Sequence, residues 1–291
     1  MGLSLHVTAS QSGTPVNIIF SNTMLTLKTR HATATVNPYG AQVMSFVPEG
    51  GADVLWQTTP EILAAAEKGG KALRGGIPTC WPWFRTHPTM PDAPIHGLAR
   101  TQTWTLESET STADRAAAIF TMDTYGSHPA FPHKARARLV VTLTDSLLLQ
   151  LTTTNIGPSP MPLTQALHTY LRVSDVSAVM VEGLEGLPRK HISSWTDQAP
   201  HQVLRINGEI EHLYKGVNRS IHVGDKTRTL TVETTSDQVV VWNPGIEKAK
   251  ALDMPADGYK SMLCIEAANI EPVLSIAAGS SHTLATRLSV R

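Results

Sequence analysis

The sequence has few cysteines, no net charge and no long apolar run, and each of these shortages excludes a class of protein. Its two cysteines, Cys80 and Cys264, are too few for a framework of disulfide bonds. The 24 lysine and arginine residues are balanced by 24 aspartate and glutamate residues, so no overall field attracts nucleic acid or an anionic membrane. Any anion must therefore be bound by basic side chains that gather locally.

Membrane and export signals are equally sparse. The longest apolar runs, such as residues 146–151, are far shorter than a membrane span. The N-terminus lacks the basic start and apolar run of a secretory signal, and His6 stands where a myristoylation signal beginning at Met1-Gly2 needs serine or threonine. We therefore expect a cytoplasmic protein that binds neither membranes nor nucleic acid.

The motifs of metal, nucleotide and nucleophilic sites are also missing. The cysteines form no CxxC pair and the histidines show no HExxH or comparable spacing. No serine lies in GxSxG, and no Walker loop or GxGxxG follows a predicted strand. These gaps predict a protein that requires neither a metal ion nor a cofactor.

What the sequence does contain is a succession of short β-branched or alternating segments separated by turn residues. It has no internal repeat and no linker-like tract. We therefore predict an all-β fold, a large antiparallel β-sandwich with one or two short helices, which residues 1–291 form as a single domain. Strands are expected within 16–47 and at 101–107, 115–123, 134–142, 146–155, 161–173, 178–182, 219–223, 227–234, 238–242, 260–267 and 282–290.

Two segments depart from the strand pattern. Residues 59–68 predict a helix, because Thr59 can cap it, Pro60 suits its first position and Gly69-Gly70 ends it. Residues 183–215 are polar and have little periodicity, which predicts a loop or a lid.

The segment from Arg74 to Arg100 is the least regular and the most chemically mixed. It places arginine, tryptophan and histidine among glycines and prolines, as in RGGIPTCWPWF and HGLAR. Gly75-Gly76 and Pro78 interrupt regular structure on both sides of Ile77. An apolar core has no use for this mixture, whereas a small-molecule site lined by loops commonly has it.

A candidate catalytic histidine lies in the predicted strand 161–173. Alternation places His168 and Tyr170 on one face and Leu167 and Leu171, which belong to the core, on the other. His168 therefore lies on the more polar face, where an imidazole can reach a ligand and act near neutral pH. From the spacing alone, a half-buried histidine bonded to a neighbour is the simpler explanation.

A candidate catalytic carboxylate follows a nearly continuous apolar stretch within 259–269. Glu266 shares a strand face with Met262 and Cys264. An ionised glutamate in such surroundings is costly unless it is paired or needed for function. The spacing leaves open the alternative that Glu266 ends a strand and turns to solvent.

The sequence RGGIP-x-CWPWF, followed by HG-x-AR and a tryptophan, resembles the signature of the hexose-6-phosphate mutarotases. These enzymes, also called glucose-6-phosphate 1-epimerases, are a branch of the aldose 1-epimerase family. The resemblance covers most of the chain and is strongest at 74–104, 164–173 and 241–266. It implies a twisted antiparallel super-sandwich with its site on a concave sheet face, with His168 as general acid and Glu266 as general base.

The resemblance also implies substrate-binding roles. Arg74 and Arg100 match the arginines with which the family binds phosphate, and planar guanidinium groups suit that task. Arg85 is a weaker third candidate, because family members more often have glycine there. His96 could bond a sugar hydroxyl or the ring oxygen, or it could only stabilise a turn.

The remaining positions leave the substrate preference open. Trp83 and Trp81 could stack on a pyranose or pack in the core, and we expect packing for at least one of them. Glu211 can accept sugar hydroxyls. Besides Arg85, the sequence departs from the family pattern at four positions, where Ile95 replaces glutamine, Leu98 replaces phenylalanine and Glu211-His212 replaces aspartate and arginine.

The implied reaction is the interconversion of the α and β anomers of glucose 6-phosphate and related hexose 6-phosphates. A base takes the proton of the anomeric hydroxyl while an acid protonates the ring oxygen, and the opened ring recloses on either face. An ionised glutamate and a histidine of raised pKa would supply both groups at one pH. The expected partner is a small hexose 6-phosphate, and the expected state is a monomer.

Two other functions fit the same residues. One is an aldose 1-epimerase that acts on free sugars, with Arg74 and Arg100 serving the structure. The other is a sugar- or phosphosugar-binding protein without turnover. The presence of both His168 and Glu266 argues against simple binding, which needs no matched acid and base.

Overall fold

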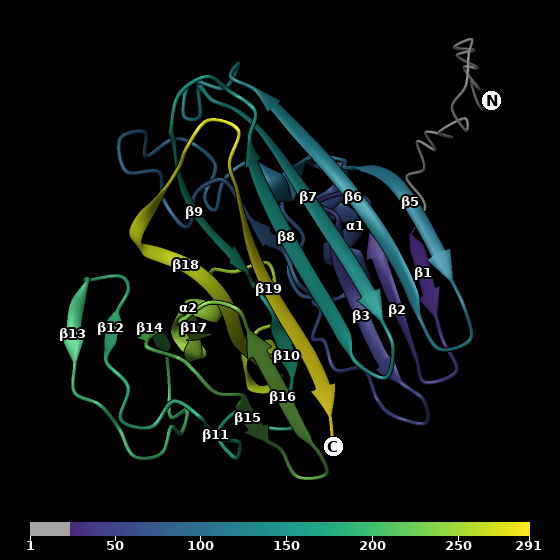
Figure 1. Cartoon of the computed structure of the whole chain (residues 1–291). Helices are drawn as coiled ribbons and strands as arrows, with labels where there is room; N and C mark the ends of the chain where they lie inside the picture. The colour runs from purple at the N-terminus through teal and green to yellow at the C-terminus, as the bar shows by residue number, and fades with distance from the viewer. Residues whose placement is uncertain (1–23) are drawn as a thin grey trace.

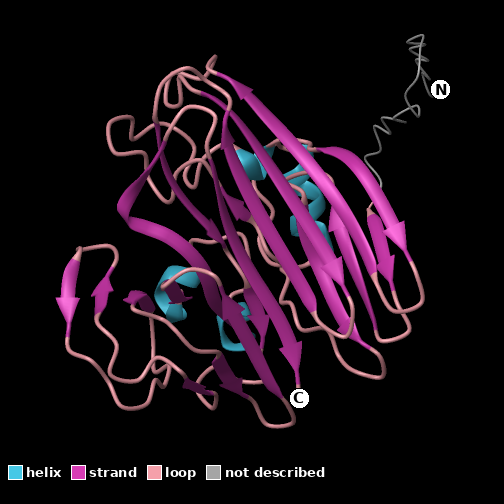
Figure 2. Ribbon diagram, in the orientation of Figure 1, coloured by secondary structure: helices cyan, strands magenta, loops and turns pink. Residues whose placement is uncertain are grey.

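A computed structural model describes residues 24–291, and β-strands dominate it (Figure 1). The strands form one three-stranded and two eight-stranded sheets. Helix is scarce in these residues, where the α-helices are α1 (Pro60–Lys68) and α2 (Gly245–Ala249) (Figure 2). The predicted all-β, antiparallel sandwich with one or two short helices is confirmed. No helix in residues 24–291 has the length and apolar character needed to cross a membrane.

The three-stranded sheet contains the first strands of the described chain. Its order is β1 (Leu25–Lys28), β2 (Ala32–Asn37) and β3 (Gln42–Pro48). These strands confirm the strand prediction from residue 25 onward, whereas residues 16–23 lie outside the described residues. The sheet packs on β6 (Ala116–Tyr125) and β7 (Lys134–Leu143).

The first eight-stranded sheet, here the outer sheet, contains most of the long strands of the middle and end of the chain. The predicted strand 101–107 is wrong at its start, because Ala99–Thr101 forms a 3₁₀-helix and the strand begins only at Thr105. The Trp104 indole N–H donates to the Ala99 carbonyl at 3.1 Å, which stabilises the turn between them. The order of the sheet is β11 (Met180–Glu182), β15 (Ile221–Gly224), β16 (Thr229–Thr234), β19 (Ser281–Val290), β8 (Leu147–Asn155), β7, β6 and β5 (Thr105–Ser111).

The second eight-stranded sheet, here the site sheet, includes a region predicted as loop. The prediction of a loop or lid over 183–215 is wrong, because three strands extend the sheet there. Two of these strands have only three residues each, too few to show a period of two. The order is β13 (Thr196–Gln198), β12 (Arg189–His191), β14 (Ile210–Lys215), β17 (Gln238–Asn243), β18 (Met262–Ile276), β9 (Met161–Leu167) and β4 (Thr79–Cys80), and β10 (Tyr170–Arg172) also pairs with β18.

The site sheet buries side chains on both faces. Leu167 and Leu171 join the main core between the sheets, whereas Tyr170 and Trp242 join a second cluster on the opposite face. Alternation along a strand produces this division. Because both faces are covered, the central strand β17 reads QVVVWN, a nearly continuous apolar run.

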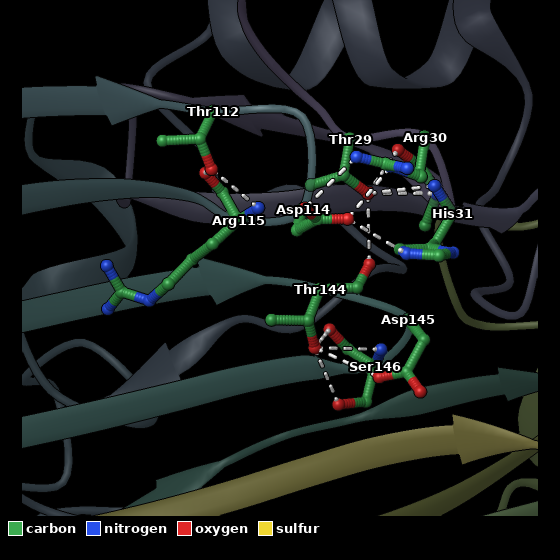
Figure 3. A network of polar contacts seen from close by, with 10 residues as sticks. Thr29, Arg30, His31, Thr112, Asp114, Arg115, Thr144, Asp145 and Ser146 are labelled. Atoms are coloured by element: carbon green, nitrogen blue, oxygen red, sulfur yellow. Dashed lines mark hydrogen bonds and ion pairs between the residues drawn. The ribbon is translucent and has the colours of Figure 1, made fainter.

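Polar contacts join the turns at one end of the molecule (Figure 3). Thr29 Oγ1, between β1 and β2, donates to the Thr144 carbonyl between β7 and β8 at 3.1 Å. Arg30 forms an ion pair with Asp114, between β5 and β6, at 2.8 Å. An exposed pair of this kind contributes at most about 1 kcal/mol, so these contacts fix the turns more than they stabilise the fold.

Two glycines determine the path of the segment between Arg74 and Arg100. Gly76 has φ of 60°, and a Cβ atom there would lie 2.1 Å from the Val43 carbonyl oxygen. Gly97 has φ of 80°, and its Cβ atom would lie 2.1 Å from the Trp81 carbonyl oxygen. Only glycine permits both the left-handed backbone and the close approach.

Helix α1 leads into this segment as predicted. Thr59 caps it by accepting a hydrogen bond from the Ile62 N–H, and Pro60 occupies the first turn. Gly69 ends it by donating to the Ala65 carbonyl.

Candidate active site

A cavity of about 300 Å³ lies on the face of the site sheet that carries the second apolar cluster. Its walls come from the irregular segment 74–100, from the site sheet and from α2. Six of the seven residues predicted to form the site line this cavity: Arg74, His96, Arg100, His168, Glu211 and Glu266.

The predicted acid and base face each other across two paired strands. Leu167 pairs with Ala267 and Tyr170 pairs with Cys264, so His168 lies opposite Glu266. The His168 Nε2 atom is 3.4 Å from a Glu266 carboxylate oxygen.

The predicted strand 161–173 is interrupted at this point. His168 and Thr169 separate β9 from β10, and the His168 N–H donates instead to the Pro78 carbonyl at 2.9 Å. The faces are nevertheless those predicted, because the pairing register with β18 continues through the break.

Aromatic rings hold the His168 imidazole in place. The Tyr170 ring stacks on it at 4.7 Å with an interplanar angle of 11°, and Trp242 contacts it edge-on at 5.8 Å. His168 is 7% exposed and Glu266 is 1% exposed. The His168 Nδ1 atom and one Glu266 oxygen are buried without a hydrogen-bond partner among the described residues, a feature that buried groups with a catalytic role can show.

Burial determines the protonation of this pair in the free protein. Together with charge repulsion from Arg100 and Arg74, it lowers the pKa of His168 to about 3. Burial also raises the pKa of Glu266 well above its ordinary value, and the charge of Glu211 adds to that rise. The expectation of a raised histidine pKa is therefore wrong for the unliganded cavity, where the neutral pair is favoured.

Arg74 and Arg100 present guanidinium groups to the cavity. Arg74 donates to the Tyr170 hydroxyl at 3.3 Å, and Arg100 donates to the Ile95 carbonyl at 2.8 Å. Neither forms an ion pair with a carboxylate of residues 24–291, and the buried Arg74 Nε atom has no partner there. Guanidinium groups without a carboxylate partner are suited to an anionic ligand.

His96 both stabilises a turn and lines the cavity. Its N–H donates to the Arg85 carbonyl at 2.9 Å, and its Nδ1 atom accepts from the Arg85 N–H at 3.2 Å. The proton of the neutral ring is therefore on Nε2, which leaves a donor for a ligand. Burial lowers the pKa of His96 well below its ordinary value, and nearby arginines lower it further.

Glu211 is surrounded by donors from three separate segments. Arg85 of the irregular segment forms an ion pair with it at 2.9 Å, and Lys248 of α2 approaches its other oxygen at 3.6 Å. The Ser193 hydroxyl, between β12 and β13, also donates to that oxygen. We call Arg85, Glu211 and Lys248 the charged cluster.

Trp83 is the predicted site residue that does not line the cavity. It is 5% exposed, it belongs to the main core, and its indole N–H donates to the Pro94 carbonyl at 3.0 Å. Trp81 is also buried in that core and donates to Thr153. Both tryptophans therefore pack, and the predicted contact of Trp83 with substrate is not supported by its position.

Sequence reasoning missed several lining residues. Tyr170, Trp242, Lys248 and Leu252 are among them. Strand alternation could have identified Tyr170, which shares the face of His168. No local signal distinguishes Lys248 from a solvated helix residue.

One further group raises the question of a metal ion. The donor atoms of His168, Cys264 and Glu266 lie within 4.8 Å of one another, and nitrogen, sulfur and oxygen donors suit zinc. Burial raises the pKa of the Cys264 thiol well above its ordinary value, which disfavours the thiolate that binds metals. The neighbouring arginines further oppose a cation, so these residues fit a metal ion poorly.

The antiparallel sandwich thus carries a cavity in which a buried histidine and a buried glutamate meet. The model of the family "Aldose 1-epimerase" matches residues 23–289. The chain therefore belongs to the aldose 1-epimerase family.

Named relatives and solved structures agree with this assignment. A protein of Cenchrus ciliaris and one of Escherichia coli K12, both named "Putative glucose-6-phosphate 1-epimerase", are 33% and 32% identical over 86% and 79% of this chain, and the matches cover 79% and 77% of those proteins. The structure of a "putative mutarotase" from Salmonella typhimurium has a TM-score of 0.82 at 25% identity, covering 95% of this chain and 96% of that one.

Proposed function

We propose that the protein interconverts the α and β anomers of glucose 6-phosphate and related hexose 6-phosphates. The observation that carries the proposal is the pair of guanidinium groups, Arg74 and Arg100, beside the acid and base. These groups have no carboxylate partner in residues 24–291, so both can donate hydrogen bonds to a phosphate. The names of the two relatives support the same substrate.

The charge of the cavity also favours a dianion. Four basic side chains face two carboxyl groups, and with Glu266 protonated and the histidines neutral the excess is three positive charges. A phosphate monoester carries a charge of about −1.5 to −2 near pH 7 and would balance most of that excess. The charged lining residues are Arg74, Arg85, Arg100, Lys248, Glu211 and Glu266.

Ring opening needs one proton to enter and one to leave. The base takes the proton of the anomeric hydroxyl, the bond between C1 and the ring oxygen breaks, and the acid gives a proton to that oxygen. The open-chain aldehyde then rotates about C1–C2, and the reverse transfers close the ring on the other face. His168 and Glu266, 3.4 Å apart, can perform both transfers on one pyranose.

The bound phosphate would influence which residue holds the shared proton. Without substrate, burial favours a protonated Glu266 and a neutral His168. Arg100 and Arg74 contribute to the low pKa of His168, and a phosphate dianion would compensate their charge. Binding therefore raises the pKa of His168 toward the acid role that the family resemblance implies, and compensation of Arg100 raises the pKa of Glu266 as well.

The proposed enzyme needs no cofactor, because a proton donor and a proton acceptor suffice for this chemistry. We further propose that residues 1–291 act as a single domain, as a monomer and in the cytoplasm.

Exchange spectroscopy tests the activity directly. The rate at which the α and β anomeric protons interchange is measured by NMR at equilibrium, for glucose 6-phosphate and for glucose. We expect acceleration of the phosphosugar by the wild type and loss of about 10²–10⁴-fold in kcat for Glu266→Gln. Glu107→Gln, an exposed carboxylate of β5, is the matched control.

Each other outcome identifies a different function. Equal acceleration of glucose and glucose 6-phosphate would indicate an epimerase of free sugars. Binding of glucose 6-phosphate without acceleration would indicate a binding protein.

A further inference from the structure

The charged cluster lies at the wall of the cavity and takes no part in the two proton transfers assigned to His168 and Glu266. Its strongest contact is the 2.9 Å ion pair between Arg85 and Glu211. The Glu211 side chain is nearly buried, whereas the Arg85 side chain is about one-third exposed. A nearly buried carboxylate needs such a partner, because isolated burial of its charge is costly.

The backbone holds Arg85 firmly in this position. The Arg85 N–H donates to the His96 Nδ1 atom at 3.2 Å, and the Arg85 carbonyl accepts from the His96 N–H at 2.9 Å. These two hydrogen bonds join the ends of the loop that runs from Arg85 to His96. Arg85 has φ of 63°, a left-handed conformation that glycine would adopt with less strain. The presence of arginine at a position whose backbone favours glycine points to a role for its side chain.

Two carboxylates share the cavity. Burial is the main cause of the raised pKa of Glu266, and the charge of Glu211 raises it further. Arg100 and, to a smaller extent, Arg85 act on the same carboxyl group in the opposite direction, and His168 lies 3.4 Å from it. The ion pair therefore places a positive charge where it offsets the unfavourable effect of Glu211. Without Arg85, the two carboxylates would compete for protons, as like charges in one site do.

We propose that Arg85 is a positioning residue whose ion pair with Glu211 sets the pH range in which Glu266 exchanges protons with a sugar. The proposal rests on the proposed function and extends it to a residue outside the acid and base pair. Arg85 need not contact the reacting atoms. It acts through the charge that it holds next to Glu211.

Removal of either charge should move the pH–rate profile in a defined direction. Arg85→Met removes a positive charge, which raises the pKa values of the neighbouring acid and base and moves both limbs of the pH–rate profile to higher pH. Glu211→Gln removes a negative charge and moves the profile to lower pH. The double variant should return close to the wild-type profile, because the two charges compensate one another.

The kinetic test is the pH dependence of kcat/KM between pH 5.5 and 9, measured by anomer exchange. We expect the ratio of Arg85→Met to wild-type activity to rise at least about threefold between pH 6 and pH 8.5. The ionisation of the substrate phosphate cancels in this ratio. Arg85→Lys, which keeps the charge, should restore much of the wild-type profile.

Two controls separate charge from structure. Methionine and arginine experience the same left-handed strain at position 85, so Arg85→Met isolates the side chain. Arg138→Met removes a partly exposed arginine of β7 and should leave the profile unchanged. A uniform loss at every pH, or double-variant losses that simply add, would overturn the proposal.

A second readout does not depend on turnover. Carboxyl ¹³C resonances of Glu266, assigned with Glu266→Gln, report its ionisation in the free protein by NMR titration. Arg85→Met should move that titration to higher pH, and an unmoved titration would refute the coupling. Absent turnover in the wild type with a shifted titration would refute the proposed function while supporting the charge coupling.

Discussion

Replacement of Arg74 by methionine tests the phosphate-binding role most directly. The substitution removes the guanidinium group and keeps a long apolar side chain. Among residues 24–291, the Arg74 guanidinium group forms one hydrogen bond, the 3.3 Å contact with the Tyr170 hydroxyl. The structure therefore leaves most of its donors free for a ligand, and their loss should affect a phosphosugar far more than a free sugar.

The expected magnitude follows from the kind of contact. A hydrogen bond that involves charged groups contributes about 1.5–3 kcal/mol. Loss of one such contact to phosphate should lower kcat/KM for glucose 6-phosphate by about 10- to 150-fold. Glucose has no phosphate, so its smaller turnover should change much less. Anomer exchange measured by NMR gives both values under the same conditions.

The matched control is Tyr170→Phe. It deletes the same hydrogen bond between Arg74 and Tyr170 but keeps the guanidinium group and the ring that stacks on His168. It should therefore retain most of the selectivity for the phosphosugar. If Arg74→Met lowers the turnover of both sugars equally, the reasoning about phosphate is refuted.

Three further predictions concern catalysis and stability. His168→Gln should lower kcat by about 10²–10⁴-fold with little change in the urea midpoint; a smaller loss would exclude an essential acid. Gly76→Ala should lower the free energy of unfolding by at least about 2 kcal/mol, because its Cβ would lie 2.1 Å from a carbonyl oxygen. Gly50→Ala, with φ of 68° and nothing within 4 Å, should lose only about 1 kcal/mol, and equal losses would contradict the steric argument. Burial depresses the pKa of His96 in the folded state, so the neutral ring contributes folding stability that is fully present above about pH 6.5. As the pH falls below that value, the free energy of unfolding decreases by up to about 1.4 kcal/mol per pH unit. His96→Asn should flatten this acid slope in urea titrations, and an unchanged slope would show that His96 is accessible to protons.

Much of the local structure is legible in the sequence. The cap at Thr59 and the stop at Gly69-Gly70 define α1, because capping depends on neighbouring residues alone. The alternation that assigned His168 to one face and Leu167 to the other is equally local and agrees with the two apolar clusters. Strands too short to show a periodicity cannot be identified in this way, and for that reason β12 and β13 were predicted as loop.

The resemblance to a family signature, which covers most of the chain, extends the sequence prediction to the site. It identified Arg74, Arg100, His96, His168, Glu211 and Glu266, which line one cavity. It also suggested Trp83, which lies in the core instead. An aromatic residue in an irregular segment can face either a ligand or the interior, and local sequence does not distinguish these outcomes.

The sequence by itself determined the kinds of side chain available and the face of each strand on which they lie, because both depend on residues close together in the chain. Only the tertiary structure decided that β18 pairs with β9 and β10, which brings His168 within 3.4 Å of Glu266. It also decided the low pKa of His168 and the pairing of Arg85 with Glu211. These properties depend on burial and on charges from distant segments, and such interactions arise only when the chain is folded.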